Sequence, residues 1–160
     1  MQALDRTDRR ILDLLQSEGR ISNAELADRV HLSPSACLRR VRQLELSGLI
    51  EGYRALLRPE ALGRGSTVFV EISLSHQSEE MLNAFEQAVI ELPEVMECYL
   101  MAGDADYMLR VITADAGDYE RIHRTQLTRL PGVARIRTLF TLRTVIRRTA
   151  IPLPDQQPKS

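Results

Sequence analysis

Apolar residues recur every three or four positions near the start of the chain. The run extends from Leu4 to Leu15, and Gly19 ends it. Two early acids, Asp5 and Asp8, favour the positive end of a helix dipole. The pattern predicts a helix that opens the chain.

The positions that follow predict two more short helices joined by a tight turn. Ser22 and Glu25 are spaced so that each side chain satisfies the other's backbone N–H, and a helix therefore begins near Asn23. His31 and Leu32 form the turn. Together with the first helix, this hairpin predicts a three-helix head.

The second helix of the hairpin has a strongly specified start. Ser33 caps it, and Pro34 occupies the first helical position, where a missing N–H costs nothing. At 100° per residue one side is apolar and the other is polar. The side expected to pack on the head carries Pro34, Cys37, Leu38, Val41 and Leu44. The side expected to face out carries Ser35, Ala36, Arg39 and Gln43, flanked by Arg40 and Arg42.

The exposed side of this helix suits the major groove of DNA. Small residues allow close approach, Arg reads guanine or phosphate, and Gln pairs with adenine. Two alternatives compete, because three arginines are often only a solvated face and helical hairpins also occur in enzymes. The caps and the short turn favour double-stranded DNA as the partner. The expected DNA contacts are Ser22, Asn23, Ser33, Ser35, Ala36, Arg39, Arg40, Arg42 and Gln43.

A change in composition separates the head from the rest of the chain. Residues 49–57 are short and extended, and predict either a small wing or a strand that leaves the head. One proline and two glycines in residues 58–65 mark a boundary. The expected organisation is a helix-turn-helix domain at 1–57, a linker at 58–65, a second domain at 66–148 and a flexible, proline-rich tail at 149–160.

Strand and helix periods alternate through the second domain. The predicted elements are strands at 67–75, 95–102, 107–113 and 133–146, and helices at 79–92 and 118–130. The order βαββαβ predicts an α+β fold, a ferredoxin-like sandwich with both helices on one face of an antiparallel sheet. The other face carries apolar groups and has no cover within the chain, so we expect a homodimer.

Composition refines this picture. The formal net charge of -1 argues against a protein coated in basic charge. Residues 1–58 hold ten arginines against eight acids, so the head is weakly basic and a dimer would supply two heads. Cys37 and Cys98 are too few for a disulfide framework or a zinc site, and we expect both in the core, in a reducing compartment. Without an apolar leader or membrane-length segment, the chain is expected to be soluble and cytoplasmic.

The turn between the second and third predicted strands concentrates ligand chemistry. Backbone N–H groups and two carboxylates converge there, which suits the carboxylate and ammonium of a free amino acid. Gly-Asp-Ala-Asp is also an ordinary hairpin turn whose acids are solvated. The expected contacts of a small effector are Gly103, Asp104, Asp106 and Tyr107 of the turn, with Leu100 and Met101 against its side chain.

An enzyme is the rival class, because Asp104 and Asp106 could imitate a pair of catalytic carboxylates. The three histidines have no ligand spacing, and the chain lacks a glycine-rich phosphate loop or a nucleophile beside a base. We therefore expect no catalytic residue, metal or cofactor. A sensor of metabolites that binds no DNA is a further alternative, which the helical hairpin argues against.

Five stretches in order resemble the Lrp/AsnC, or feast/famine, family of regulators across nearly the whole chain. They are LDRTDRRIL from Leu4, GRISNAELADRV from Gly19, LSPSACLRRVRQLE from Leu32, SGLIEGYRALL from Ser47 and GDADYMLRV from Gly103. The resemblance implies a prokaryotic transcription regulator with a helix-turn-helix head and a ligand-sensing, oligomerising second domain. Relatives often carry Thr or Pro where this chain has Ala36, which leaves the operator sequence open.

The resemblance also implies more about the assembly than the residues themselves do. Members of the family form dimers that often build rings, which implies a homodimer assembling to a tetramer or octamer. It places an amino acid effector between subunits. The final strand, at Leu139, Phe140 and Thr141, would contact this effector from across the interface.

Overall fold

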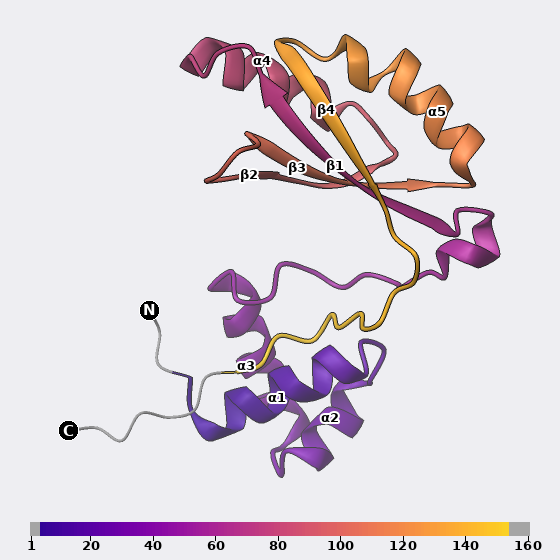
Figure 1. The fold of residues 1–160 in the computed structure, drawn as a ribbon. Helices are drawn as coiled ribbons and strands as arrows, with labels where there is room; N and C mark the ends of the chain where they lie inside the picture. Colours follow the sequence, from indigo (N-terminus) through magenta and orange to yellow (C-terminus); the bar gives the residue numbers. More distant parts are fainter. Residues whose placement is uncertain (1–3, 154–160) are drawn as a thin grey trace. The chain divides into compact units, whose positions relative to one another are not determined.

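The computed structural model describes residues 4–153, and these form two compact units (Figure 1). The first unit, the head, runs to Leu56 and takes up the chain again from Ile146. The second, the sensor domain, spans Leu57–Val145. None of the helices in the described range is long and apolar enough to cross a bilayer.

Three helices build the head around one core. They are α1 (Arg6–Ser17), α2 (Asn23–Arg29) and α3 (Pro34–Leu46). Ile11, Ala27 and Cys37 are fully buried where the helices meet. Because Ala27 is small, α3 can cross α2 at close range. The expected caps are present, since the side chains of Ser22 and Ser33 accept hydrogen bonds from backbone N–H groups three residues on.

The buried stripe of α3 is narrower than its sequence predicts. Cys37 and Leu44 lie in the core, but Pro34 is exposed and Leu38 is 39% exposed. Within the head, the helices that pack on α3 are α1 and α2, and they leave Pro34 and Leu38 outside the core. Residues 50–58 form neither strand nor helix, so the expected extended segment is present without a strand of a wing.

The sensor domain is a four-stranded antiparallel sheet with two α-helices, α4 and α5, on the same face (Figure 1). Its strands are β1 (Ser66–Leu74), β2 (Val95–Leu100), β3 (Tyr107–Thr113) and β4 (Val133–Phe140), in the order β2-β3-β1-β4. Its helices are α4 (Glu79–Ile90) and α5 (Ala116–Thr125), with short 3-10 turns at Pro59–Leu62 and Leu127–Arg129. This order confirms the predicted α+β, ferredoxin-like fold.

Alternation along β1 decides which residues meet the helices. Val68, Val70 and Ile72 are fully buried against α4 and α5, whereas Phe69 is 37% exposed on the opposite face. The register pairs Phe69 with Leu139 of β4, and this residue is also exposed. The sheet therefore has one sealed face and one open face.

Two predicted strands are shorter in the structure. The final strand ends at Phe140 rather than Ile146, because Thr141 makes the last bond to β1 and the chain then leaves the sheet. The second strand ends at Leu100, where the turn begins. The helix predicted at 118–130 begins earlier, at Ala116, and breaks into a 3-10 turn after Gln126.

The expected flexible tail is partly ordered. Backbone N–H of Ile151 donates to Oε1 of Gln16 at 2.6 Å, and Nε2 of Gln16 donates back to the Ile151 carbonyl at 3.2 Å. Leu153 packs against the core of the head. The rest of the predicted tail, 154–160, lies outside the described residues.

Candidate functional site

The candidate DNA-reading surface begins at the paired caps of the hairpin. Oγ of Ser33 accepts from the N–H of Ala36 at 3.3 Å and lies 3.2 Å from Oγ of Ser35. Nδ2 of Asn23 donates to the Pro34 carbonyl at 2.9 Å. Asn23 was expected at DNA, and the structure gives it a bond that ties the start of α2 to the start of α3. The first turns of the two helices therefore hold each other in place.

The outward face of α3 presents the polar groups that the sequence predicts there. Ser35, Arg39 and Gln43 are exposed, and Arg42 is exposed beside them. Within the described part of the chain, Arg39 and Arg42 form no ion pair. Their guanidinium groups are therefore available to an anionic partner. Ala36 is half-buried, so it limits how close a partner comes rather than bonding to it.

Arg40, which was expected to contact DNA, forms two ion pairs inside the head. Its Nη1 lies 2.7 Å from Oδ2 of Asp5 and 2.7 Å from Oδ1 of Asp8, both at the start of α1. Hydrogen bonds to these two acids raise the pKa of Arg40. Partial burial would raise the pKa of Asp5, but bonds from the Asp8 N–H and from Arg40 outweigh it and lower that pKa. The charge of Arg40 is committed inside the head, where it anchors α3 to α1.

The sequence pattern explained Asp5 and Asp8 only through the helix dipole. Asp5 does cap α1, since its Oδ1 accepts from the N–H of Asp8 at 2.8 Å. Its second oxygen and the Asp8 carboxylate are used by Arg40 instead. A separation of 35 residues hid this contact, and no local signal reveals it.

The two carboxylates of the predicted effector turn have different environments. Asp104 is exposed, as is Gly103. Asp106 is only 9% exposed, and its carboxylate accepts from the N–H of Leu74 at 2.6 Å and from Nε2 of Gln77. The Asp106 N–H donates to the Ile72 carbonyl. Asp106 therefore fastens the turn to the end of β1, and its contact with an effector stays a prediction.

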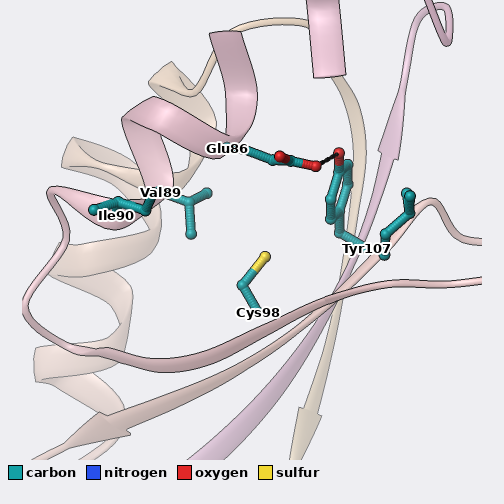
Figure 2. A pocket seen from close by; sticks show the side chains of 6 residues that line it. Glu86, Val89, Ile90, Cys98 and Tyr107 are labelled. Atoms are coloured by element: carbon teal, nitrogen blue, oxygen red, sulfur yellow. Dashed lines mark hydrogen bonds between the residues drawn. The ribbon is translucent and has the colours of Figure 1, made fainter. Parts of the chain in front are cut away.

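Tyr107 is likewise part of the sealed face rather than an exposed turn residue. It is 1% exposed, stacks at 4.4 Å from the Phe85 ring, and donates from its hydroxyl to Oε1 of Glu86 at 2.8 Å. Burial and the neighbouring Glu86 raise its pKa. Its edge nevertheless reaches a cavity, because the small Cys98 leaves space between β2 and α4 (Figure 2). The cavity is lined by Glu86, Val89, Ile90, Cys98, Leu100 and Tyr107.

Cys98 is thus not the core residue that composition predicted, because it is exposed beside that cavity. Of the two residues expected to meet an effector side chain, Leu100 lines the cavity and is 60% exposed, and Met101 is 44% exposed outside the lining. The sequence pattern did not predict Glu86 or Val89 at a cavity. Both belong to an amphipathic helix whose period places them near its apolar stripe. Only the packing of α4 on the sheet brings them to β2.

The three residues expected from the final strand divide between the two faces of the sheet. Leu139 pairs with Phe69 and lies on the open face, whereas Phe140 pairs with Val68 on the helix side and stacks edge-on with Tyr119 at 5.3 Å. Thr141 follows the strand and its N–H donates to the Thr67 carbonyl. The structure does not bring these residues together with the turn at Gly103 within one chain. Alternation alone separates Leu139 from Phe140.

The histidines occupy unrelated places. His31 forms the turn of the hairpin with φ of 56°, His76 lies 3.1 Å from Oγ of Ser75, and His123 lies against the Tyr119 ring. In the range 4–153, no three His, Cys, Asp or Glu side chains are grouped to hold a metal ion. The carboxylate of Asp106 accepts hydrogen bonds from Leu74 and Gln77, whereas Asp104 is exposed, so the two carboxylates have different surroundings.

Two family models match the chain, one for each unit. Residues 4–51 match a winged helix-turn-helix DNA-binding domain. Residues 67–151 match the Lrp/AsnC ligand binding domain.

Curated relatives match almost end to end. The chain is 45% identical over 153 residues to the Bkd operon transcriptional regulator of Pseudomonas aeruginosa, covering 96% of this chain and 100% of that protein. It is 47% identical over 142 residues to the leucine-responsive regulatory protein of Escherichia coli, covering 89% of this chain and 87% of the relative.

Solved structures agree with these matches. A transcriptional regulator of Neisseria meningitidis in complex with L-Met is 36% identical and has a TM-score of 0.89, covering 94% of this chain and 97% of the other. AsnC of Escherichia coli is 26% identical with a TM-score of 0.85, covering 92% of this chain and 98% of the other.

The ion pairs of Arg40 predict a stability effect that its exposed neighbour Arg42 lacks. Arg40→Ala should lower the free energy of unfolding by about 1 kcal/mol, because two charged hydrogen bonds are lost and two acids are left facing each other. Arg42→Ala, the matched control, should change it by less than about 0.5 kcal/mol. Denaturant unfolding of the full chain measures both, and equal losses would remove the anchoring role.

The same pair gives a pH dependence with a defined sign. In the folded protein the pKa of Asp5 is lower than its ordinary value of 3.8. The stabilisation that the charged carboxylate contributes to the fold is therefore fully present above that pH. The stability difference between the wild type and Arg40→Ala should therefore be full at neutral pH. It should shrink as the pH falls below 3.8 and the carboxyl takes up its proton.

Proposed function

This chain belongs to the Lrp/AsnC family of transcriptional regulators, and from that membership we propose that it regulates transcription by binding specific DNA under the control of an amino acid. One observation carries the DNA-binding part. The face of α3 that carries Ser35, Arg39 and Gln43 is exposed, and α3 is fixed at its start by Asn23 and along its length by Arg40. A rigid helix with small residues first and Arg and Gln beyond fits the major groove. Bacterial DNA lies in the cytoplasm, so we place the protein there.

We propose three kinds of role for the predicted DNA contacts. Ser35, Arg39 and Gln43 are proposed to read bases, and Arg42 to contact phosphates. Ser22, Ser33 and Asn23 hold the helix starts, where their unused groups can meet the DNA backbone. Arg40 acts at a distance, by setting the direction of α3.

Arg39 is the residue expected to contribute most to operator binding. Arg39→Ala should weaken binding to a specific site by about 1–3 kcal/mol, because a bidentate contact to a base is lost. Gel-shift titration against genomic fragments, at one fixed salt concentration, measures the loss. The variant's circular dichroism must match the wild type.

Random DNA of equal length is the control for this measurement. A base-reading Arg39 should lose little affinity there, since only the phosphate contribution remains. Equal losses on specific and random DNA would reduce Arg39 to a phosphate contact.

An amino acid is the proposed effector. One relative is named for its response to leucine, and a structural neighbour was crystallised with L-Met. The exposed turn supports this chemistry, because Gly103 leaves its backbone open and Asp104 offers a carboxylate to an ammonium group. The anchored position of the turn also supports an amino acid effector, because Asp106 bonds the turn to β1 without a ligand. We propose that the effector lies between subunits, with Leu139 and Thr141 of a second subunit opposite the turn.

Asp104 is the expected partner of the effector's ammonium group. Asp104→Asn should weaken binding of the amino acid by roughly 1.5–3 kcal/mol, the range for a hydrogen bond to a charged group. A thermal-shift screen of the twenty amino acids finds the ligand, because binding to the folded state raises the melting temperature. Calorimetric titration then compares the wild type with the variant.

Glu120→Gln, which removes an exposed acid from α5, is the control for Asp104. It should leave the affinity for the amino acid unchanged, and both variants should still bind DNA without ligand. Unchanged affinity of Asp104→Asn would leave the turn as structure only.

We propose that the open face of the sheet joins two subunits. Phe69, Tyr99 and Leu139 are exposed there, and the ion pairs Arg110–Glu97 and Arg137–Glu71 lie beside them in the same cross-strand rows. Exposed aromatic and aliphatic groups with charges already paired beside them form a surface that a second subunit can cover. Two heads would then be available for two half-sites, with a tetramer or octamer of such dimers as the larger assembly.

A charge at the centre of this face should break the dimer. Phe69→Glu should convert the full chain to a monomer at micromolar concentration, because each subunit would have to bury an added charged side chain in the interface. Sedimentation velocity measures the mass. Leu142→Glu, at a residue 99% exposed outside the sheet, should keep the wild-type mass. A dimer of Phe69→Glu would place the interface elsewhere.

A further inference from the structure

The cavity between α4 and the edge strand β2 has the size of a small ligand. Its volume is about 310 Å³, at the lower end of the range for ligand sites. Figure 2 shows Cys98 pointing from β2 into the space that Val89 and Glu86 border from α4. Ile90 and Leu100 are 71% and 60% exposed, so the cavity opens to solvent on their side. Access from solvent therefore requires no movement of the fold.

The lining has one apolar part and one acidic end. Val89, Ile90 and Leu100 supply aliphatic surface, and Glu86 supplies the single ionisable carboxylate among the lining residues. Tyr107 donates to one oxygen of that carboxylate and fixes its position. A carboxylate offers about four acceptor sites, so Glu86 retains capacity for a further donor. No lysine or arginine lines the cavity.

Cys98 makes the space without bringing reactive chemistry of its own. Desolvation, and secondly the charge of Glu86, raise the pKa of its thiol to about 11. The side chain is therefore a neutral thiol at physiological pH, a poor nucleophile and a small, weakly polar wall. A larger residue at this inward position of β2 would fill the gap that Figure 2 shows beneath Val89.

We propose that this cavity binds a small aliphatic ammonium compound, with its ammonium group on Glu86 and its alkyl chain against Val89, Ile90 and Leu100. The cavity shares Leu100 and Tyr107 with the residues expected at the amino acid site, but its charged group, Glu86, lies on α4 and is not among them, so this proposal does not depend on Asp104. A cation is favoured because Glu86 is the only charged group in the lining and is already oriented by Tyr107.

The same charge discriminates against close analogues. A compound with the same alkyl chain and a carboxylate in place of the amine would place two negative charges together. An amino acid gains the ammonium contact but brings its own carboxylate to the same end of the cavity. The order of affinity should therefore be amine first, amino acid second and carboxylic acid last.

Three probes with one shared alkyl group test this order on the full chain. They are 3-methylbutylamine, L-leucine and 3-methylbutanoate, titrated at pH 7 and followed by the methyl resonances of Val89, Ile90 and Leu100 in NMR spectra. The amine should give saturable shifts with a Kd on the order of 1 mM, as expected for so small a ligand in an open site. The carboxylate should give none. Equal shifts from all three probes, or shifts from the carboxylate alone, would overturn the proposal.

Two variants locate the binding. Glu86→Gln keeps an acceptor for the Tyr107 hydroxyl but loses the negative charge. It should lower the affinity for the amine by roughly tenfold to a hundredfold. Cys98→Leu fills the cavity and should abolish the shifts. Glu80→Gln, an exposed acid on the same helix, is the control and should bind as the wild type does.

Matched circular dichroism spectra make the variants comparable. If Cys98→Leu does not fold, Glu86→Gln alone decides, because unchanged amine affinity there contradicts the site. Gel shifts of the same proteins keep this result apart from the proposed function. The variants should lose amine binding and keep DNA binding, which agrees with both proposals. A wild-type protein that binds the amine but no DNA would contradict only the proposed regulatory function.

Discussion

The sensor domain depends on one constraint, which is that a β-strand has two faces and this chain supplies helices for only one. In β1 the residues Val68, Val70 and Ile72 are completely buried under α4 and α5. Burial of each of these aliphatic side chains stabilises the fold by roughly 1.5–3 kcal/mol. A one-residue slip of register would expose the whole row, and no single polar contact could offset that loss. The register of β1 with β3 and β4 is therefore fixed. The open face at Phe69 is the necessary counterpart of that sealing.

The sites follow from where this constraint ends. At the end of β1 the carboxylate of Asp106 accepts a hydrogen bond from the Leu74 N–H and fixes the end of the strand. A buried carboxylate is stable only with partners, so its cost is offset by hydrogen bonds from Leu74 and Gln77. Asp104, two residues earlier, has no such task and stays exposed. At the outer edge of the sheet, β2 has a neighbour on one side only, and the small Cys98 leaves the cavity under α4.

The head uses charge in two ways that the sequence does not distinguish. Arg39 and Arg40 are adjacent on α3, yet the helical turn of 100° points one outward and the other at the start of α1. A single guanidinium between two carboxylates gains more than an isolated surface pair, because it also keeps the two acids from repelling each other. With its side chain 29% exposed, the contribution of Arg40 stays modest in energy. Its importance lies in orientation, because Arg40 fixes the direction in which the exposed face of α3 points.

Local features of this protein were determined by the sequence itself. The caps at Ser22 and Ser33, the buried row of β1 and the order of elements were all predictable, because each depends on residues at most a few positions apart. Contacts between distant residues were not. Arg40 finds Asp5 across 35 positions, Asp106 finds Leu74 across 32, and Gln16 finds Ile151 across 135. Only the tertiary structure decided these, because periodicity specifies which face a side chain occupies and leaves open which group the folded chain brings to it.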